Sequence, residues 1–152
     1  LTCMHPGRAD VIWNNVDRGL ALSGRGRADF DLAPTVAVTV GDDVDQCRAP
    51  YKQQLALYIG GMGSKKKNFY KEYLCKVGFE ESCDRIQTAF LAGQRAEAVA
   101  LVPDEMVDTL YLVGSPERIR DRFAAWKDSG VGTMIVGATQ PEAIRLLAEL
   151  NS

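Results

Sequence analysis

The segment Leu55–Tyr70, LALYIGGMGSKKKNFY, combines residue types that could hold an anionic ligand. An apolar helical run ends at three glycines, three lysines follow, and a second helical run begins at Asn68. Glycine tolerates positive φ and a close approach of the backbone to a ligand, and the lysines add positive charge at the same place. The segment therefore predicts contact with a cofactor tail or an anionic substrate, through Gly60, Gly61, Met62, Gly63 and Lys65.

Other interpretations of this segment remain open. It is not a P-loop, because its glycines follow a helix rather than a strand and Lys65 is followed by Lys66. A solvated basic corner between two helices is the plainer explanation of the lysines. Nucleic acid is disfavoured, since no aromatic residues interleave with the lysines and the net charge is −2. The side chains of Asn68, Phe69 and Tyr70 could line a substrate channel, although aromatic residues at helical spacing more often pack in a core.

Two further places could do chemistry. The turn Val136–Thr139 leads from an apolar run into a helical pattern, so the N–H groups around Gly137 and Thr139 could hold an anion. Any strand-to-helix connection has this spacing, so the signal is weak. Asp42 and Asp43 could share a proton in acid–base chemistry, but a carboxylate there more simply caps a helix, and we favour capping.

Thiol and imidazole content argues against a zinc site. The four cysteines, Cys3, Cys47, Cys75 and Cys83, show no C-x-x-C spacing, and His5 is the single histidine. Reduced thiols of a cytoplasmic protein are expected. With 46 % apolar and 25 % charged residues the composition is that of a globular protein, without a membrane-spanning run or a secretion signal.

Two apolar runs rich in β-branched residues predict strands, at Pro34–Val40 and Val131–Val136. Between them the pattern is largely helical. Pro50 places the start of the first of these helices near Ala49 or kinks it there. Ser115 and Pro116 mark a clear helix start, and Thr139 with Glu142 has the pattern of a capping box. Two parallel strands separated by about 90 residues make an incomplete architecture, because a parallel sheet needs both faces and edges covered.

The two segments Leu55–Tyr70 and Leu112–Val136 resemble the C-terminal part of the luciferase-like monooxygenase family, in the branch that uses the deazaflavin coenzyme F420. The resemblance implies an α/β fold, the C-terminal portion of a (β/α)₈ TIM barrel, which needs about 250 residues in full. Residues 1–152 would then form a single domain, with Pro34–Val40 and Val131–Val136 as the seventh and eighth barrel strands, lying side by side and parallel.

The same resemblance implies an oxidoreductase that transfers hydride to or from a small organic substrate, with F420 as cofactor or FMN as the alternative. The catalytic residues would lie in earlier strands, so we expect the chain by itself to be inactive. Unpaired strand edges predict a homo-oligomer or association with the missing N-terminal part of the barrel. The competing hypothesis is a non-catalytic, helix-rich module that functions by self-association.

Overall fold

The computed structural model describes residues 1–64 and 67–151. The chain divides into two compact units, one formed by Leu1–Asp42 with Leu110–Ser152 and the other by Asp43–Thr109. That residues 1–152 fold as a single domain stays a prediction. No helix of the described residues is long and apolar enough to cross a bilayer.

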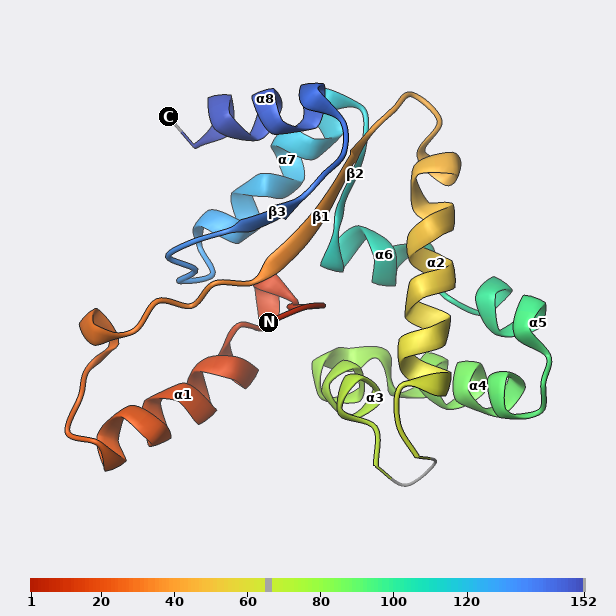
Figure 1. Cartoon of the computed structure of the whole chain (residues 1–152), viewed down its shortest axis with the longest axis horizontal. Coiled ribbons are helices and arrows are strands. Elements are labelled where there is room, and N and C mark those ends of the chain that lie inside the picture. The colour runs from red at the N-terminus through yellow and green to blue at the C-terminus, as the bar shows by residue number, and fades with distance from the viewer. Residues whose placement is uncertain (65–66, 152) are drawn as a thin grey trace. The chain divides into compact units, whose positions relative to one another are not determined.

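The first unit is built on a parallel sheet in the order β2-β1-β3, with β1 (Thr35–Val40) between β2 (Leu112–Gly114) and β3 (Ile135–Gly137) (Figure 1). The register joins Val38 to Leu112 and Thr35 to Ile135. The predicted parallel pairing of the two apolar runs is therefore confirmed. The expectation of only two strands is wrong. The sheet has a third strand, β2, which is too short to give a strand pattern in the sequence.

The second apolar run also differs from its expected form. Val131–Val136 was expected to be a buried strand, whereas β3 covers only Ile135–Gly137 and is exposed at all three residues. The physical reason is its position: β3 pairs with β1 along one edge, and the described residues supply no strand on the other. The side chain of Val136 remains 38 % exposed at this edge.

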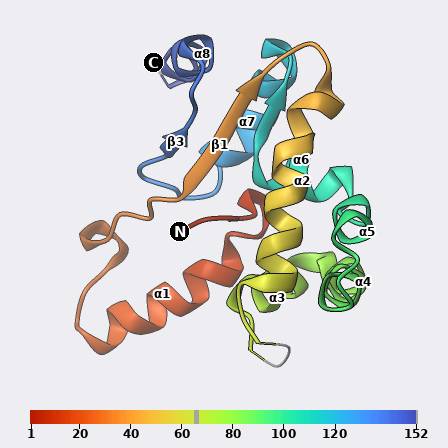
Figure 2. The ribbon, with the colours of Figure 1, turned by 45° about the vertical axis from the view of Figure 1, so that its right-hand side comes forward.

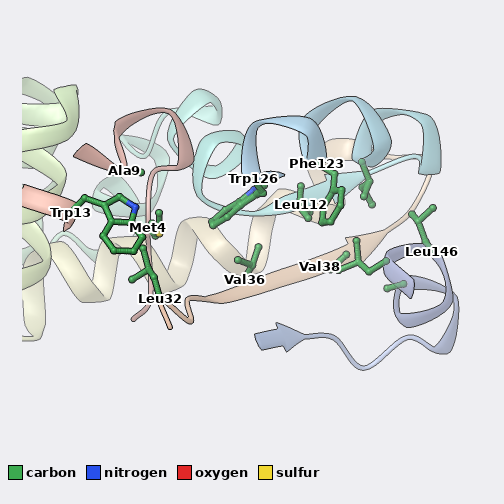
Figure 3. Packing of buried hydrophobic residues seen from close by; sticks show 13 residues of the cluster. Met4, Ala9, Trp13, Leu32, Val36, Val38, Leu112, Phe123, Trp126 and Leu146 are labelled. Atoms are coloured by element: carbon green, nitrogen blue, oxygen red, sulfur yellow. The ribbon is translucent and has the colours of Figure 1, made fainter. Parts of the chain in front are cut away.

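Three helices bury the core of the first unit, namely α1 (Asp10–Leu22), α7 (Pro116–Lys127) and α8 (Pro141–Leu150). Alternate β1 residues Val36 and Val38 are buried and face the α7 side chains Phe123 and Trp126 (Figure 3). The indole of Trp13 donates a hydrogen bond to the Ser129 carbonyl at 3.1 Å. This contact ties α1 to the end of α7.

Two helix starts in this unit show how local signals compete. The hydroxyl of Ser115 accepts from the Arg118 N–H, so α7 begins as predicted. The capping box predicted at Thr139 and Glu142 is wrong, because α8 starts one residue later, after Gln140. The Gln140 amide instead bonds the end of β1, accepting from the Val40 N–H at 2.8 Å and donating to the Val40 carbonyl at 2.9 Å.

The second unit is helical. It contains α2 (Val44–Gly61), α3 (Phe69–Leu74), a π-helical turn (Cys75–Phe79), α4 (Glu80–Leu91) and α5 (Arg95–Ala100), and α6 (Asp104–Leu110) leads out of it. Figure 2 shows α2 running past α5 and α4, both of which it contacts.

The expected start of the first of these helices near Ala49 is wrong. The Asp43 carboxylate accepts hydrogen bonds from the Asp45 and Gln46 N–H groups, and α2 continues through Pro50. The capping role favoured for this carboxylate is confirmed at Asp43.

Candidate functional site

The glycines that end α2 allow it to pack closely against α4. A Cβ atom on Gly60 would overlap the Phe90 ring, and one on Gly61 would lie 2.8 Å from the Phe90 ring edge. The Arg95 guanidinium carbon also lies over the Phe90 ring, 3.9 Å from its centroid. The first two glycines of the segment thus have a packing role.

Gly63 serves the turn that follows. A Cβ atom there would lie 2.6 Å from the Lys67 carbonyl oxygen, which the Ser64 N–H contacts at 3.1 Å. Positive φ is absent at Gly60, Gly61 and Gly63, so their conformational freedom is not what the described backbone uses. The requirement at all three positions is space.

Asn68 is buried at 3 % exposure, and its side chain is fully engaged. Its amide nitrogen donates to the carbonyls of Tyr58 and Ile59, each at 2.9 Å, and its oxygen accepts from the Lys71 N–H at 3.0 Å. The side chain therefore joins the end of α2 to the start of α3 and shapes the turn between them. Contact of Asn68 with a substrate stays a prediction.

The aromatic residues after Asn68 lie nearer the surface. The Tyr70 ring stacks on Tyr58 with centroids 4.4 Å apart, and Phe69 meets Tyr70 edge-on at 5.6 Å. Phe69 is 62 % exposed and Met62 is 51 % exposed. Together with Gly61 and Gly63, which are also exposed, they form a surface that could accept the apolar part of a ligand. Lys65 lies outside the described residues.

The carboxyl end of the sheet carries the other predicted contacts. Gly137 ends β3 and Thr139 lies in the loop that follows, and both are exposed. The first turn of α8 suits an anion poorly, since Pro141 lacks an N–H and Glu142 brings a carboxylate. An anion here would have to be held by the loop N–H groups. These two residues belong to the first unit, and the glycine–aromatic surface belongs to the second.

A charged cluster in the second unit was missed from the sequence. Arg48 makes a two-pronged contact with Asp108, at 3.0 and 2.7 Å, and also reaches Asp45 at 2.7 Å and Asp104 at 3.2 Å. The Asp108 side chain is 9 % exposed and that of Arg48 is 11 % exposed. Hydrogen bonding to Asp108 raises the pKa of Arg48 above its ordinary value. The cluster joins α2 to α6, and the spacing of Asp104 and Asp108, one helical turn apart, was its signal in the sequence.

An apolar groove of about 410 Å³ opens beside β3 in the first unit. Phe123, Met134, Val136, Ile144 and Leu147 are among the residues that line it. Ile144 is 53 % exposed, and Ile135 on the neighbouring strand is 49 % exposed. The strand edge and the groove together present apolar surface of the kind that another element covers.

Comparison with known proteins identifies the family. The chain is 36 % identical over 147 residues to a Mycobacterium tuberculosis protein whose name places it among coenzyme F420-dependent oxidoreductases, covering 95 % of this chain and 42 % of that protein. It is 25 % identical over 138 residues to the 5,10-methylenetetrahydromethanopterin reductase of Archaeoglobus fulgidus, covering 91 % and 41 %.

A solved structure shows the same fold. It is the coenzyme F420-dependent tetrahydromethanopterin reductase of Methanopyrus kandleri, which superposes with a TM-score of 0.64 at 19 % identity and covers 95 % of this chain and 41 % of that one. The fold of the chain is accordingly that of a partial TIM barrel. The chain spans about two fifths of the length of these relatives. The profile of the luciferase-like monooxygenases matches residues 3–133, and the chain belongs to this family.

Proposed function

We propose that the chain is the C-terminal part of a cytoplasmic coenzyme F420-dependent oxidoreductase that transfers hydride to or from a small organic substrate. The observation that carries the proposal is the 36 % identity, over nearly the whole chain, to the Mycobacterium tuberculosis protein named for F420-dependent oxidoreductase activity. The likeness to the methylenetetrahydromethanopterin reductases supports the same cofactor class. A purely structural self-association module is not favoured, because these relatives are named as enzymes.

The residues of the second unit fit one part of such a ligand. Exposed Met62 and Phe69 would contact an apolar ring or substrate, with Gly61 and Gly63 allowing close approach of the backbone. Asn68 would act through the turn that it holds, and Tyr70 through its stacking on Tyr58.

Other predicted residues would contact an anionic group. Lys65 supplies a cation in the sequence. In the first unit, loop N–H groups around Gly137 and Thr139 would receive an anion. When bound, F420 supplies the hydride chemistry itself, and the task of the protein is to bind, orient and exclude water.

The remaining barrel strands would cover the open surface of the first unit. Parallel sheets are buried on both faces in known folds, whereas β3 is exposed along its length and adjoins the apolar groove. We therefore place the N-terminal part of the barrel against this edge. The catalytic acid or base would come from that part.

Ligand titration tests the proposal. The product of the longest reading frame that contains this chain is titrated with reduced F420 and, separately, with FMN, and binding is followed by absorbance and fluorescence. Saturable binding of F420 without comparable binding of FMN is expected. Binding of FMN alone would reassign the cofactor, and binding of neither would overturn the enzymatic proposal.

A further inference from the structure

The Gln140 side chain fills a place in the sheet that backbone groups normally occupy. Pairing of β1 with β3 ends at Ala37 and Gly137, and the same register continued along both segments would set Gln140 opposite Val40. By that point the chain has left β3 and is about to enter α8. The Gln140 amide instead accepts from the Val40 N–H at 2.8 Å and donates to the Val40 carbonyl at 2.9 Å. One side chain thus supplies both hydrogen bonds of a strand residue.

The backbone that follows β3 is poorly suited to this task. The Ile135 N–H donates to the Pro34 carbonyl at 2.9 Å, and the two-residue repeat of a parallel ladder would assign the Val40 carbonyl to the N–H of the residue at position 141. That residue is Pro141, which has no N–H. The Gln140 amide therefore completes the pairing of β1 on the β3 side.

The position of Gln140 at the start of α8 points the same way. It is the N-cap residue of that helix, but its side chain makes no capping hydrogen bond. Serine, threonine, aspartate and asparagine are better caps, and all of them are shorter than glutamine. The longer side chain reaches β1, and the Glu142 carboxylate, 3.4 Å from the same amide nitrogen, helps to orient it.

This contact lies at the carboxyl end of the sheet. There β3 passes into the loop Ala138–Thr139, and Thr139 is exposed. In TIM barrels the loops at this end of the strands form the active site, and the chain has the fold of a partial TIM barrel. A residue that fixes this loop to β1 therefore acts on the face where a ligand binds.

We propose that Gln140 is a positioning residue, whose amide fixes the loop Ala138–Thr139 to the end of β1 in the conformation that meets the bound cofactor. Ala138 packs against the core of the first unit, so the loop would stay near the sheet without the amide. Its course beyond Ala138 would no longer be set by β1. The cofactor part of this proposal rests on the proposed function, whereas the contact with Val40 does not.

Substitution by serine separates this role from the start of α8. Gln140→Ser keeps a side chain that caps a helix but is too short to reach Val40. The protein encoded by the longest reading frame that contains this chain is prepared with and without the substitution. Hydrogen exchange of the Val40 amide is followed by mass spectrometry at residue resolution, and F420 affinity by fluorescence titration. We expect faster exchange at Val40 and F420 binding weakened about tenfold, with a thermal midpoint close to that of the wild type.

Two further variants sharpen the comparison. Gln140→Asn keeps the amide and a good cap but is one methylene group shorter, so it should behave like Gln140→Ser. Gln94→Ser is the matched control, because Gln94 is also an N-cap residue, of α5, whose side chain makes no capping hydrogen bond. It should leave both the exchange at Val40 and the F420 affinity at their wild-type values.

The two readouts fail in different ways. Unchanged exchange at Val40 in Gln140→Ser would overturn the contact itself. Faster exchange with unchanged F420 affinity, or an equal loss of affinity in Gln94→Ser, would overturn the positioning role. A wild-type protein that binds no F420 would overturn the proposed function and the cofactor part of this proposal together, while the exchange at Val40 would still decide whether Gln140 holds β1.

Discussion

Gly60 and Gly19 both lie inside helices, but their surroundings give them opposite sensitivities to a methyl group. A Cβ atom at Gly60 overlaps the Phe90 ring, whereas one at Gly19 meets nothing within 4 Å. We predict that Gly60→Ala destabilises the protein by about 1–3 kcal/mol through overpacking. Gly19→Ala should stabilise it by about 0.5–1 kcal/mol, since alanine favours the helix. Chemical denaturation of the two variants checks the pair.

If the glycines acted only by contacting a ligand, the effect on stability would differ. Gly60→Ala would then leave stability unchanged and lower only F420 affinity. Phe90→Ala should not rescue Gly60→Ala, because the Phe90 Cβ atom that alanine keeps lies 2.4 Å from the added methyl group. It should recover part of the loss caused by Gly61→Ala, whose added methyl group meets Phe90 only at its ring edge, at 2.8 Å.

Asn68 offers a second comparison at this scale. Asn68→Ala leaves the Tyr58 and Ile59 carbonyls and the Lys71 N–H without their side-chain partner, so we expect a loss of about 2–3 kcal/mol. Asn15→Ala is the matched control, because the exposed Asn15 amide donates one hydrogen bond, to the Val11 carbonyl. Equal effects of the two substitutions in a denaturation experiment would show that the Asn68 contacts do not hold the turn.

At the scale of elements, the Arg48 cluster fixes α6 to α2. Asp108→Ala would leave a largely buried guanidinium without its main partner, and we predict a loss of about 3 kcal/mol. The control is Asp17→Ala, which breaks an equally well aligned contact, with Arg27, between exposed side chains. The loss at Asp17 should be much smaller, because water screens the exposed pair. Thermal unfolding at neutral pH distinguishes them, and a larger loss at Asp17 would contradict this account.

Elements with strong local signals could be predicted from the sequence. Ser115 and Pro116 set the start of α7, and the β-branched run at Thr35–Val40 is a strand. The three-residue strand β2 has no room for a period-two pattern, so only its pairing with β1 reveals it. Gln140 likewise could not be identified, because its partner Val40 lies 100 residues earlier in the chain.

The candidate site was predictable to a smaller degree. The glycine–aromatic segment was located, but the reason for its glycines depends on Phe90, about 30 residues further on. A place for Asn68 in a substrate channel stays a prediction, and its three hydrogen bonds to backbone groups can be assigned only once α2 and α3 are folded. Sequence spacing shows where such residues lie, and packing determines what they contact.

At the scale of the whole molecule, the open edge of β3 and its apolar groove predict association. We expect the 152-residue chain in isolation to sediment as a dimer or larger species, because the strand edge and exposed Ile135 and Val136 favour contact with another chain. Sedimentation velocity over a dilution series measures this. A monomer at every concentration that unfolds in one cooperative transition would show that the chain is self-sufficient.

The central claim is that this chain completes an F420-binding barrel. The most direct measurement is the fluorescence of F420 titrated with the 152-residue chain, with the N-terminal part of the barrel that we propose, and with the two together. We predict no saturable change with either part and a saturable change with the mixture, since each part carries only some of the contacts. Saturable binding of F420 by the 152-residue chain alone, or none by the mixture and by the uninterrupted protein, would contradict the claim.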